Sequence, residues 1–244
     1  MGKEPLLEIA GVSKKFGGLV ALNKVDMCVH QNEIVGLIGP NGAGKTTLFN
    51  VIAGSFPPEE GTLLVQGRDV THLKAHTLCR LGIARTFQIP KPFRQLSILE
   101  NMMVGACFGS DLGIGKESLD KILKILEFAG LEDKAFMMAD TLNLVERKKL
   151  EVCKTLSTSP KLVLFDEVMA GLNPSETAEM IAFIAKLRDN DITILLIEHL
   201  MKVIMSLSDR VIVLHYGEKL YEGIPQDVAN NPQVIEAYLG KSHA

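Results

Sequence analysis

Short apolar runs, separated by polar or glycine-containing breaks, dominate the first part of the chain and predict β-strands. The predicted strands span residues 6–12, 20–30, 33–39 and 61–67. The run at 33–39 ends in a glycine-rich loop, and a helical pattern over residues 45–53 begins soon after it. The sequence therefore predicts a strand–loop–helix unit early in the chain.

The rest of the chain alternates between helical periodicity and short, fully apolar runs. Helical patterns cover residues 97–107, 117–129, 146–155 and 175–189, and strand-length apolar runs cover 162–165, 192–197 and 210–214. Strands that are apolar on both faces and alternate with helices are typical of a mainly parallel sheet. Prolines in the segment 89–93 rule out a continuous helix there and indicate a linker. We expect an α/β core interrupted by a helical insert between about residues 89 and 145.

Composition and charge narrow the class of protein. The chain has 244 residues, of which 47% are hydrophobic and 23% charged, as in a folded globular protein. A net charge of −3 without any Lys/Arg-rich block disfavours nucleic-acid binding. Mean hydropathy is +0.19, yet the apolar runs have only strand length, so we expect no membrane-spanning helix. The four cysteines are far apart and the histidines show no metal-like grouping, which predicts reduced thiols and no zinc site.

Residues 39–46 read GPNGAGKT and fit the phosphate-binding pattern G-x-x-x-x-G-K-[ST] between a strand and a helix. The glycines let the backbone turn several N–H groups towards one anion, and the following helix adds the positive end of its dipole. Lys45 is expected to face the β- and γ-phosphates of ATP, and the Thr46 hydroxyl to reach Mg²⁺. The candidate ATP-binding residues of this loop are Gly39, Asn41, Gly42, Ala43, Gly44, Lys45, Thr46 and Thr47.

A second group of candidate catalytic residues follows the apolar run 162–165. Asp166 ends the predicted strand, where a carboxylate can orient Mg²⁺ through water. Glu167 comes next and is placed to polarise the attacking water as a general base. An apolar run followed by two acids is, on its own, usually a strand that meets solvent. The preceding phosphate-binding loop makes catalysis the better interpretation.

These motifs, taken together and in this order, resemble the ATP-binding subunits of ABC transporters over nearly the whole chain. The resemblance assigns Gln88 to the Q-loop, which contacts Mg²⁺ and the permease, and His199 to the switch histidine, which contacts the γ-phosphate. Phe16 corresponds to the aromatic residue that stacks on adenine, and residues 170–173 resemble the D-loop. Each of these residues has an ordinary structural explanation when taken singly, but their shared order and spacing favour the functional one.

The resemblance also implies a fold and a domain organisation. The fold is α/β: a P-loop NTPase (RecA-like) core with an N-terminal antiparallel β subdomain and an α-helical subdomain. The ATP-binding core is discontinuous and comprises residues 1–88 and 146–241. The helical subdomain comprises residues 89–145 and ends in a degenerate signature motif.

That signature motif, normally LSGGQ, falls at residues 142–146, which read LNLVE. In the family it opens a helix that caps the γ-phosphate of ATP held by the opposite subunit. Asn143 can still cap the helix or contact phosphate, because asparagine caps as well as serine. Val145 replaces a glycine, and its branched Cβ is expected to crowd a backbone that approaches phosphate, which weakens or alters the site. Val168 and Leu200 are smaller departures, in place of a proline and an acidic residue.

Three stretches, 82–88, 96–101 and 231–240, resemble the branched-chain amino acid transporter branch of the family. This implies an ATPase that powers the import of branched-chain or related amino acids, with ATP and Mg²⁺ as cofactors. Transport systems for amides, urea, aromatic acids or lipids share the catalytic residues and stay open as alternatives. A non-transport ABC ATPase of DNA repair or translation is less favoured, because such proteins usually carry a coiled-coil insert, tandem nucleotide domains or basic arms.

The implied partners are integral-membrane permease subunits, a second ATP-binding subunit and, indirectly, a substrate-binding protein. Two ATP molecules would lie between two ATP-binding subunits that face each other head to tail. An altered signature motif fits a heterodimer with a different second subunit, and a homodimer is the alternative. No nucleic-acid partner is expected. The implied location is peripheral, at the cytoplasmic face of the cell membrane.

Overall fold

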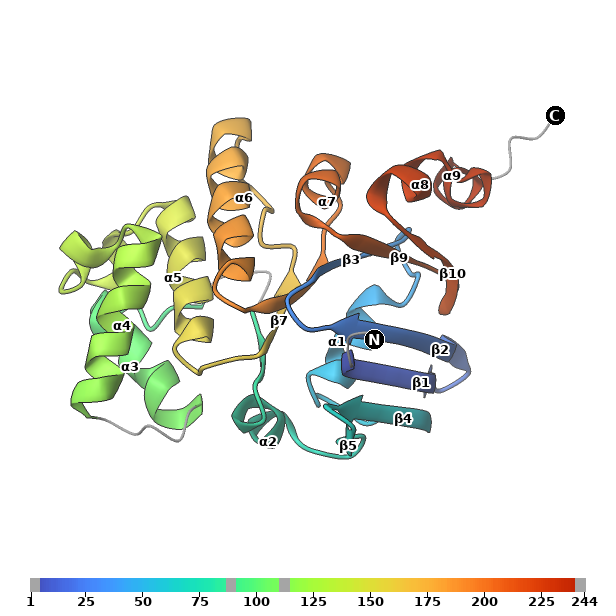
Figure 1. Cartoon of the computed structure of the whole chain (residues 1–244), viewed down its shortest axis with the longest axis horizontal. Coiled ribbons are helices and arrows are strands. Elements are labelled where there is room, and N and C mark those ends of the chain that lie inside the picture. Colours follow the sequence, from blue (N-terminus) through green and yellow to red (C-terminus); the bar gives the residue numbers. More distant parts are fainter. Residues whose placement is uncertain (1–4, 87–90, 110–114, 240–244) are drawn as a thin grey trace.

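The computed structural model describes residues 5–86, 91–109 and 115–239 and contains two sheets (Figure 1). The larger sheet has six strands in the order β10-β9-β3-β8-β7-β6. Its strands are β3 Ile34–Ile38, β6 Ile83–Arg85, β7 Leu162–Asp166, β8 Thr193–Ile197, β9 Arg210–His215 and β10 Glu218–Gly223. All neighbouring pairs are parallel except β10 with β9. This confirms the predicted α/β fold with a mainly parallel sheet.

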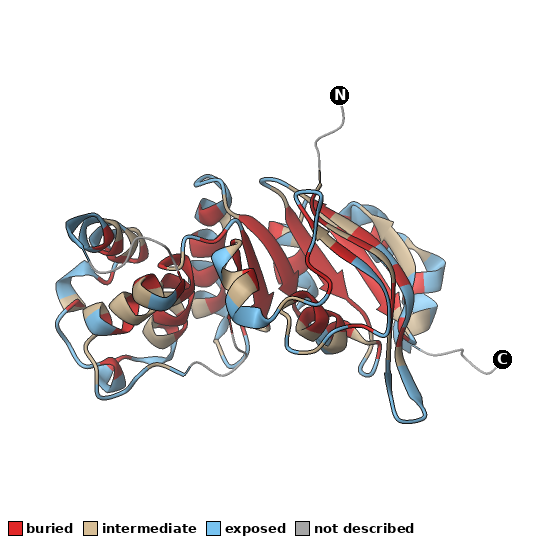
Figure 2. Cartoon of the chain, turned by 90° about the horizontal axis from the view of Figure 1, so that it is seen from below, coloured by how far each residue is buried: buried red, intermediate tan, exposed pale blue. Residues whose placement is uncertain are grey.

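The central strands are buried on both faces, because a separate hydrophobic cluster covers each face (Figure 2). Along β3, Ile34 and Ile38 belong to one cluster, whereas Val35 and Leu37 belong to the other. Successive side chains of a strand point to opposite faces, so a strand between two covered faces must be apolar at every position. The uninterrupted apolar runs in the sequence follow directly from this arrangement.

Helices α6 Pro174–Arg188 and α7 Met201–Leu207 contribute to the first cluster, and α1 Lys45–Ile52 contributes to the second. The start of α6 is specified locally by a reciprocal capping box between Asn173 and Glu176, with a proline in its first turn.

The smaller sheet is antiparallel, with strand order β2-β1-β4-β5, and shares the second hydrophobic cluster with α1. Its strands are β1 Pro5–Phe16, β2 Leu19–His30, β4 Glu60–Val65 and β5 Arg68–Asp69. Apolar side chains of its inner face are buried while many of the alternating positions are exposed. This sheet is the predicted N-terminal antiparallel β subdomain.

Three longer helices lie together at the other end of the molecule: α3 Ile98–Gly109, α4 Lys116–Ala129 and α5 Leu144–Leu156 (Figure 1). Two short 3₁₀ turns, Glu132–Lys134 and Ala139–Thr141, join α4 to α5. Each of the three helices contacts the other two, and α5 also contacts α6. The predicted division of the chain at residues 89 and 145 stays a prediction. Helix α5 starts next to residue 145 and contacts both the helical end of the molecule, through α3 and α4, and the core, through α6.

The sequence prediction missed several short elements. Among them are α2 Ala75–Arg80, α8 Pro225–Asn230 and α9 Pro232–Leu239, together with α7, β5, β6 and β10. The missed helices have at most 8 residues, which is too few turns to establish a helical period. Among the described residues, no helix is both long enough and apolar enough to cross a bilayer.

Candidate functional site

The phosphate-binding loop connects β3 to α1, as predicted, and two of its glycines are required by the packing around them. Gly39 has φ 152° and Gly44 has φ 101°, values that other residues rarely adopt. A Cβ on Gly39 would lie 2.2 Å from the carbonyl oxygen of Leu214, and one on Gly44 would lie 2.6 Å from that of Ala21. Only glycine therefore lets this loop lie against β9, which contains Leu214, and β2, which contains Ala21.

A turn from the far end of the chain supports the same loop. The N–H of Gly217, between β9 and β10, donates to the Ala43 carbonyl at 3.1 Å, and the Gly217 carbonyl accepts from Asn23 of β2 at 2.8 Å. These bonds tie the loop to both sheets and hold it in place before any ligand binds.

Lys45, the first residue of α1, is buried and points back into the loop. Its Nζ donates to the carbonyl oxygens of Gly39 at 2.7 Å and Pro40 at 3.0 Å. Burial lowers the pKa of the Lys45 amine, and the nearby charge of Glu167 offsets part of that effect. An anion bound in the loop can replace the two carbonyl oxygens as acceptors for this amine. Of the other candidate residues of the loop, Asn41 and Thr46 are exposed and Thr47 is half-buried.

Asp166 ends β7 and is buried in an ion pair that sequence reasoning missed. The Nη2 of Arg85, on β6, donates to its Oδ2 at 2.6 Å, and the Nη1 of the same guanidinium donates to Asn50 Oδ1 of α1 at 2.6 Å. Arg85 was part of the motif leading to Gln88 but was given no role. No sequence signal pointed to this ion pair, because β6, the strand that carries Arg85, was itself not predicted.

Glu167 and His199 meet because β7 and β8 are adjacent parallel strands, and both residues follow the ends of these strands. His199 Nε2 lies 2.8 Å from Glu167 Oε1. The backbone of Glu167 has φ 51°, an uncommon conformation for a non-glycine residue, and its N–H donates to Ile197 at 3.0 Å. The carboxylate of Glu167 also lies near enough to Lys45 to affect the pKa of its amine. Lys45, Glu167 and His199 thus form one site.

A second carboxylate behind this site was also missed. Glu198 is only 5% exposed and accepts a hydrogen bond from the Met169 N–H at 2.9 Å. Burial raises the pKa of Glu198 to about 7, and the charge of Glu167 adds to that effect, whereas Lys148 and His199 oppose it. Lys148 is itself buried, which lowers its pKa. Glu198 is therefore bonded to the backbone of Met169 and lies close to the charges of Glu167, Lys148 and His199.

Asn143, which the sequence analysis assigns to a degenerate signature motif, is the N-cap of α5. Its Oδ1 accepts from the Glu146 N–H at 2.9 Å, and Glu146 accepts from the Asn143 N–H at 3.1 Å, which completes a capping box. Glu146 also pairs with Lys134, which lowers the pKa of the Glu146 carboxyl. Val145 is buried, at 7% exposure, whereas Leu144 is 42% exposed. The exposed side chains at the start of this helix are therefore Asn143 and Leu144, whereas the side chain of Glu146 is 19% exposed and paired with Lys134.

Two further residues were assigned to ATP binding from the sequence. Phe16 lies at the end of β1, 47% exposed, with Phe56 packed edge-on against its ring at a centroid distance of 5.4 Å. It has the exposure that stacking on a base requires. Gln88 lies outside the described residues.

The donor set suits Mg²⁺ better than a transition metal. No group of three or more His, Cys, Asp or Glu residues within the described ranges could hold a metal ion. Thr46 at the start of α1 and Asp166 at the end of β7, which Arg85 links to α1 through Asn50, instead offer hard oxygen ligands. Mg²⁺ typically takes one or two such protein ligands and completes its shell with phosphates and water.

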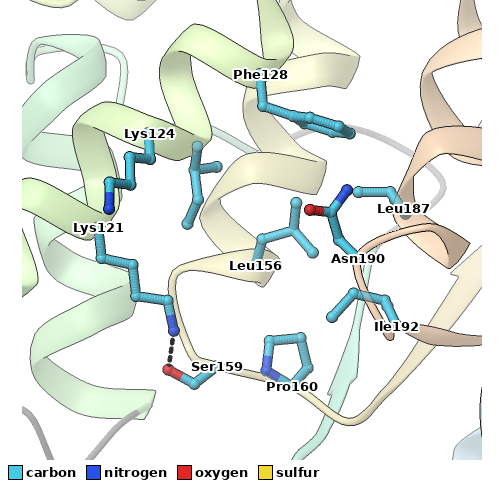
Figure 3. A pocket seen from close by; sticks show the side chains of 10 residues that line it. Lys121, Lys124, Phe128, Leu156, Ser159, Pro160, Leu187, Asn190 and Ile192 are labelled. Atoms are coloured by element: carbon cyan, nitrogen blue, oxygen red, sulfur yellow. Dashed lines mark hydrogen bonds between the residues drawn. The ribbon is translucent and has the colours of Figure 1, made fainter.

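Two cavities are lined by none of the three residues Lys45, Glu167 and His199 that form the site. A groove of 660 Å³ runs between α2, β6, α3 and α5, and Arg85, Phe93, Phe108 and Lys154 are among its lining residues. A pocket of 380 Å³ lies where α4 and the end of α5 meet the end of α6 (Figure 3). Its wall is mostly apolar, and Lys121 donates a hydrogen bond to Ser159 across its edge. None of the ATP-binding candidates lines this second pocket.

Known proteins resemble this chain along almost its whole length. A family model described as ABC transporter matches residues 22–170, and one described as branched-chain amino acid ATP-binding cassette transporter matches residues 218–244. The high-affinity branched-chain amino acid transport ATP-binding protein LivG of Escherichia coli is 40% identical over 98% of this chain and 99% of its own length. The corresponding protein BraF of Pseudomonas aeruginosa is 37% identical, with the same two coverages of 98% and 99%.

Solved structures agree with these sequence matches. An ATP-binding cassette of an ABC transporter in its ADP conformation has a TM-score of 0.90 and 32% identity, over 98% of this chain and 100% of that one. A nucleotide-free cassette from an ABC transporter has a TM-score of 0.89 and 30% identity, over the same shares of 98% and 100%.

Proposed function

We propose that this chain, which belongs to the ATP-binding subunits of ABC transporters, powers the import of branched-chain or chemically related amino acids. As a member of that family it is an ATPase that works with a membrane permease. The observation that supports this choice of substrate is the near-full-length similarity to LivG and BraF, both named for branched-chain amino acid transport. The match of residues 218–244 to the branched-chain family model supports the same branch at the end of the chain.

Within the site, the phosphate-binding loop would hold the triphosphate and Lys45 would face its β- and γ-phosphates. The short bonds from Lys45 to the loop's own carbonyl oxygens support this role, because they hold the amine where phosphate oxygens would arrive. Phe16 would stack on the adenine ring with its exposed face. The ATP-contacting set is Phe16, Gly39, Asn41, Gly42, Ala43, Gly44, Lys45, Thr46, Thr47 and Gln88, with Asn143 acting on the ATP of the opposite subunit.

Glu167 would act as the general base that takes a proton from the attacking water. Its Oε1 lies 2.8 Å from His199 Nε2, so the histidine can orient the carboxylate and contact the γ-phosphate. Its uncommon backbone conformation points to a position fixed by the surrounding structure, as at other functional sites.

Mg²⁺ would be held by Thr46 and Asp166, with Gln88 as a further contact, and would neutralise charge on the phosphates. Oxygen donors on α1 and β7, two elements that Arg85 links through Asn50 and Asp166, support this assignment. Thr46 would bind the ion directly, and Asp166 would act through a bound water.

We further propose that the second ATP-binding subunit is a different chain. In this chain Asn143 is already engaged in capping its own helix, and the other exposed side chain at the start of α5 is the apolar Leu144. An apolar side chain offers the partner's γ-phosphate no hydrogen bond, so the ATP site completed by this motif would be the weaker one. The P-loop of this chain would use the intact signature motif of its partner.

The 660 Å³ groove is the proposed contact with the permease, because it joins the helical end of the molecule to β6, which leads into the segment that contains Gln88. Exposed aromatic side chains line it, including Phe108 at 77% exposure. The chain would then lie at the cytoplasmic face of the membrane, and a substrate-binding protein would be reached only through the permease.

The test is uptake of labelled leucine into proteoliposomes that contain this chain with its permease and substrate-binding subunits. We expect ATP-dependent leucine uptake that is lost with Glu167→Gln, and no competition from urea or acetamide. Uptake of urea, an amide or an aromatic acid in place of leucine would overturn the cargo and leave the ATPase assignment intact. ATP turnover with no uptake of any of these compounds would overturn the proposal that this chain powers import.

A further inference from the structure

Arg85 joins the two elements that carry the proposed Mg²⁺ ligands. Its two terminal nitrogens form separate hydrogen bonds, each of 2.6 Å, with Asp166 of β7 and Asn50 of α1. Both charged side chains of the ion pair are nearly buried, at 13% exposure for Arg85 and 10% for Asp166. The guanidinium also lies over the ring of Phe49, at 5.9 Å from its centroid.

The position of Asn50 gives this bridge its significance. Asn50 is four residues after Thr46 on α1, so the two side chains lie on the same side of the helix, one turn apart. A side chain that fixes Asn50 relative to Asp166 also fixes the distance from the Thr46 hydroxyl to the Asp166 carboxylate. The bond from Arg85 to Oδ2 also orients the Asp166 carboxylate.

We propose that Arg85 is a positioning residue that sets the separation and orientation of the Mg²⁺-holding groups of α1 and β7. The inference rests on the proposed metal site and adds to it a residue that does not touch the metal. Its two nitrogens must act together: a lysine could keep the charge beside Asp166 but could not make both bonds from a planar fork. Arg85 also lines the proposed permease groove, so movement there would reach the metal ligands through this side chain.

A role in folding alone is the competing explanation, and the strand pairing speaks against it. Arg85 pairs with Leu164 in the parallel ladder of β6 and β7, which is held by backbone bonds and not by the guanidinium. The hydrophobic cluster on the α1 side of the sheet includes Ile83, Leu162 and Leu164 and does not depend on Arg85.

The experiment measures binding of a fluorescent ATP analogue to the full chain with and without Mg²⁺, for Arg85→Ala, Arg85→Lys, Asn50→Ala and the double variant Arg85→Ala/Asn50→Ala. We expect the Mg²⁺ concentration needed for half-maximal binding enhancement to rise about tenfold for Arg85→Ala, and metal-free affinity to change by less than about threefold. Asn50→Ala and Arg85→Lys should shift the Mg²⁺ requirement in the same direction, and the double variant should be no worse than Arg85→Ala alone. Arg80→Ala, an exposed arginine on α2, is the matched control and should change neither quantity.

Each result decides the question. Equal losses with and without Mg²⁺, or a normal Mg²⁺ requirement in Asn50→Ala, would overturn the proposal, the latter because Arg85 would then act on Asp166 alone. If Arg85→Ala does not fold, Asn50→Ala and Arg85→Lys decide by the same criteria. Asp166→Asn tests the metal site itself: if it leaves the Mg²⁺ requirement normal, the proposed site fails. If Asp166→Asn alters the requirement and the Arg85 and Asn50 variants do not, only the positioning role fails.

Discussion

Glu198→Gln should make the protein more stable at alkaline pH and remove part of its pH dependence. Burial raises the pKa of Glu198 to about 7 from an ordinary value of 4.5, so the folded protein keeps a proton that the unfolded chain has lost. The free energy of unfolding therefore falls as the pH rises from about 4.5 to about 7, and above that range the contribution of protonated Glu198 is gone. At about 1.4 kcal/mol per pH unit, this interval corresponds to about 3 kcal/mol.

Glutamine cannot ionise, but its carbonyl oxygen can still accept the hydrogen bond from Met169. The variant should therefore match the wild type near pH 4.5 and exceed it by about 3 kcal/mol at pH 8, which is about 6–12 °C in Tm for a chain of this size. The groups that face Glu198 are Glu167, Lys148 and His199, and the first of these opposes its ionisation.

The assay is urea or thermal denaturation of the nucleotide-free chain from pH 5 to pH 8.5, with Glu127→Gln as the matched control. Glu127 is exposed on α4, so its replacement should give a difference from wild type that does not vary with pH. The reasoning is refuted if the stability difference between Glu198→Gln and wild type is constant across this range, or if it shrinks as the pH rises.

Three other substitutions test the site. Glu167→Gln should bind ATP with unchanged affinity and turn it over roughly 100-fold or more slowly, measured by phosphate release; normal turnover would exclude Glu167 as the base. Gly44→Ala places a Cβ 2.6 Å from the Ala21 carbonyl at a positive φ, and should lower the free energy of unfolding by about 1–3 kcal/mol and weaken ATP binding, whereas Gly18→Ala, with nothing within 4 Å, should do neither. Leu144→Gly, which removes the exposed side chain at the start of α5, should raise ATP turnover when assayed in complex with the partner ATPase subunit; equal rates for the variant and wild-type complexes would count against an altered signature motif.

The features that the sequence predicted are those in which neighbouring residues carry the information. The phosphate-binding loop, and the Asp166–Glu167 pair after an apolar strand, each lie within a few consecutive residues whose pattern is tied to their chemistry. The core strands were predictable for a related reason, since burial on both faces leaves an unbroken apolar run.

The features that were missed depend on residues brought together by the fold. The bond between Arg85 and Asp166 joins positions on β6 and β7, whose adjacency comes only from the sheet order. The proximity of Glu198 to Lys148 depends likewise on how α5 packs against the core. The sequence predicted that Val145 would crowd the approach to phosphate, but the orientation of α5 buries this side chain, and that orientation depends on packing against the rest of the fold.

The position of β3 in the large sheet determines when this protein can become active during its synthesis. β3 carries the phosphate-binding loop near the start of the chain, yet it pairs on one side with β8 and on the other with β9, so Ile34 lies opposite Ile194. The turn at Gly217 that supports the loop leaves the ribosome later still. Contacts between residues so distant in sequence form slowly, because the intervening chain must be ordered first. A nascent chain that ends before β9 has its complete phosphate-binding sequence but lacks the strand and the turn that support the loop. We therefore expect the capacity to bind nucleotide to arise only when synthesis is almost finished.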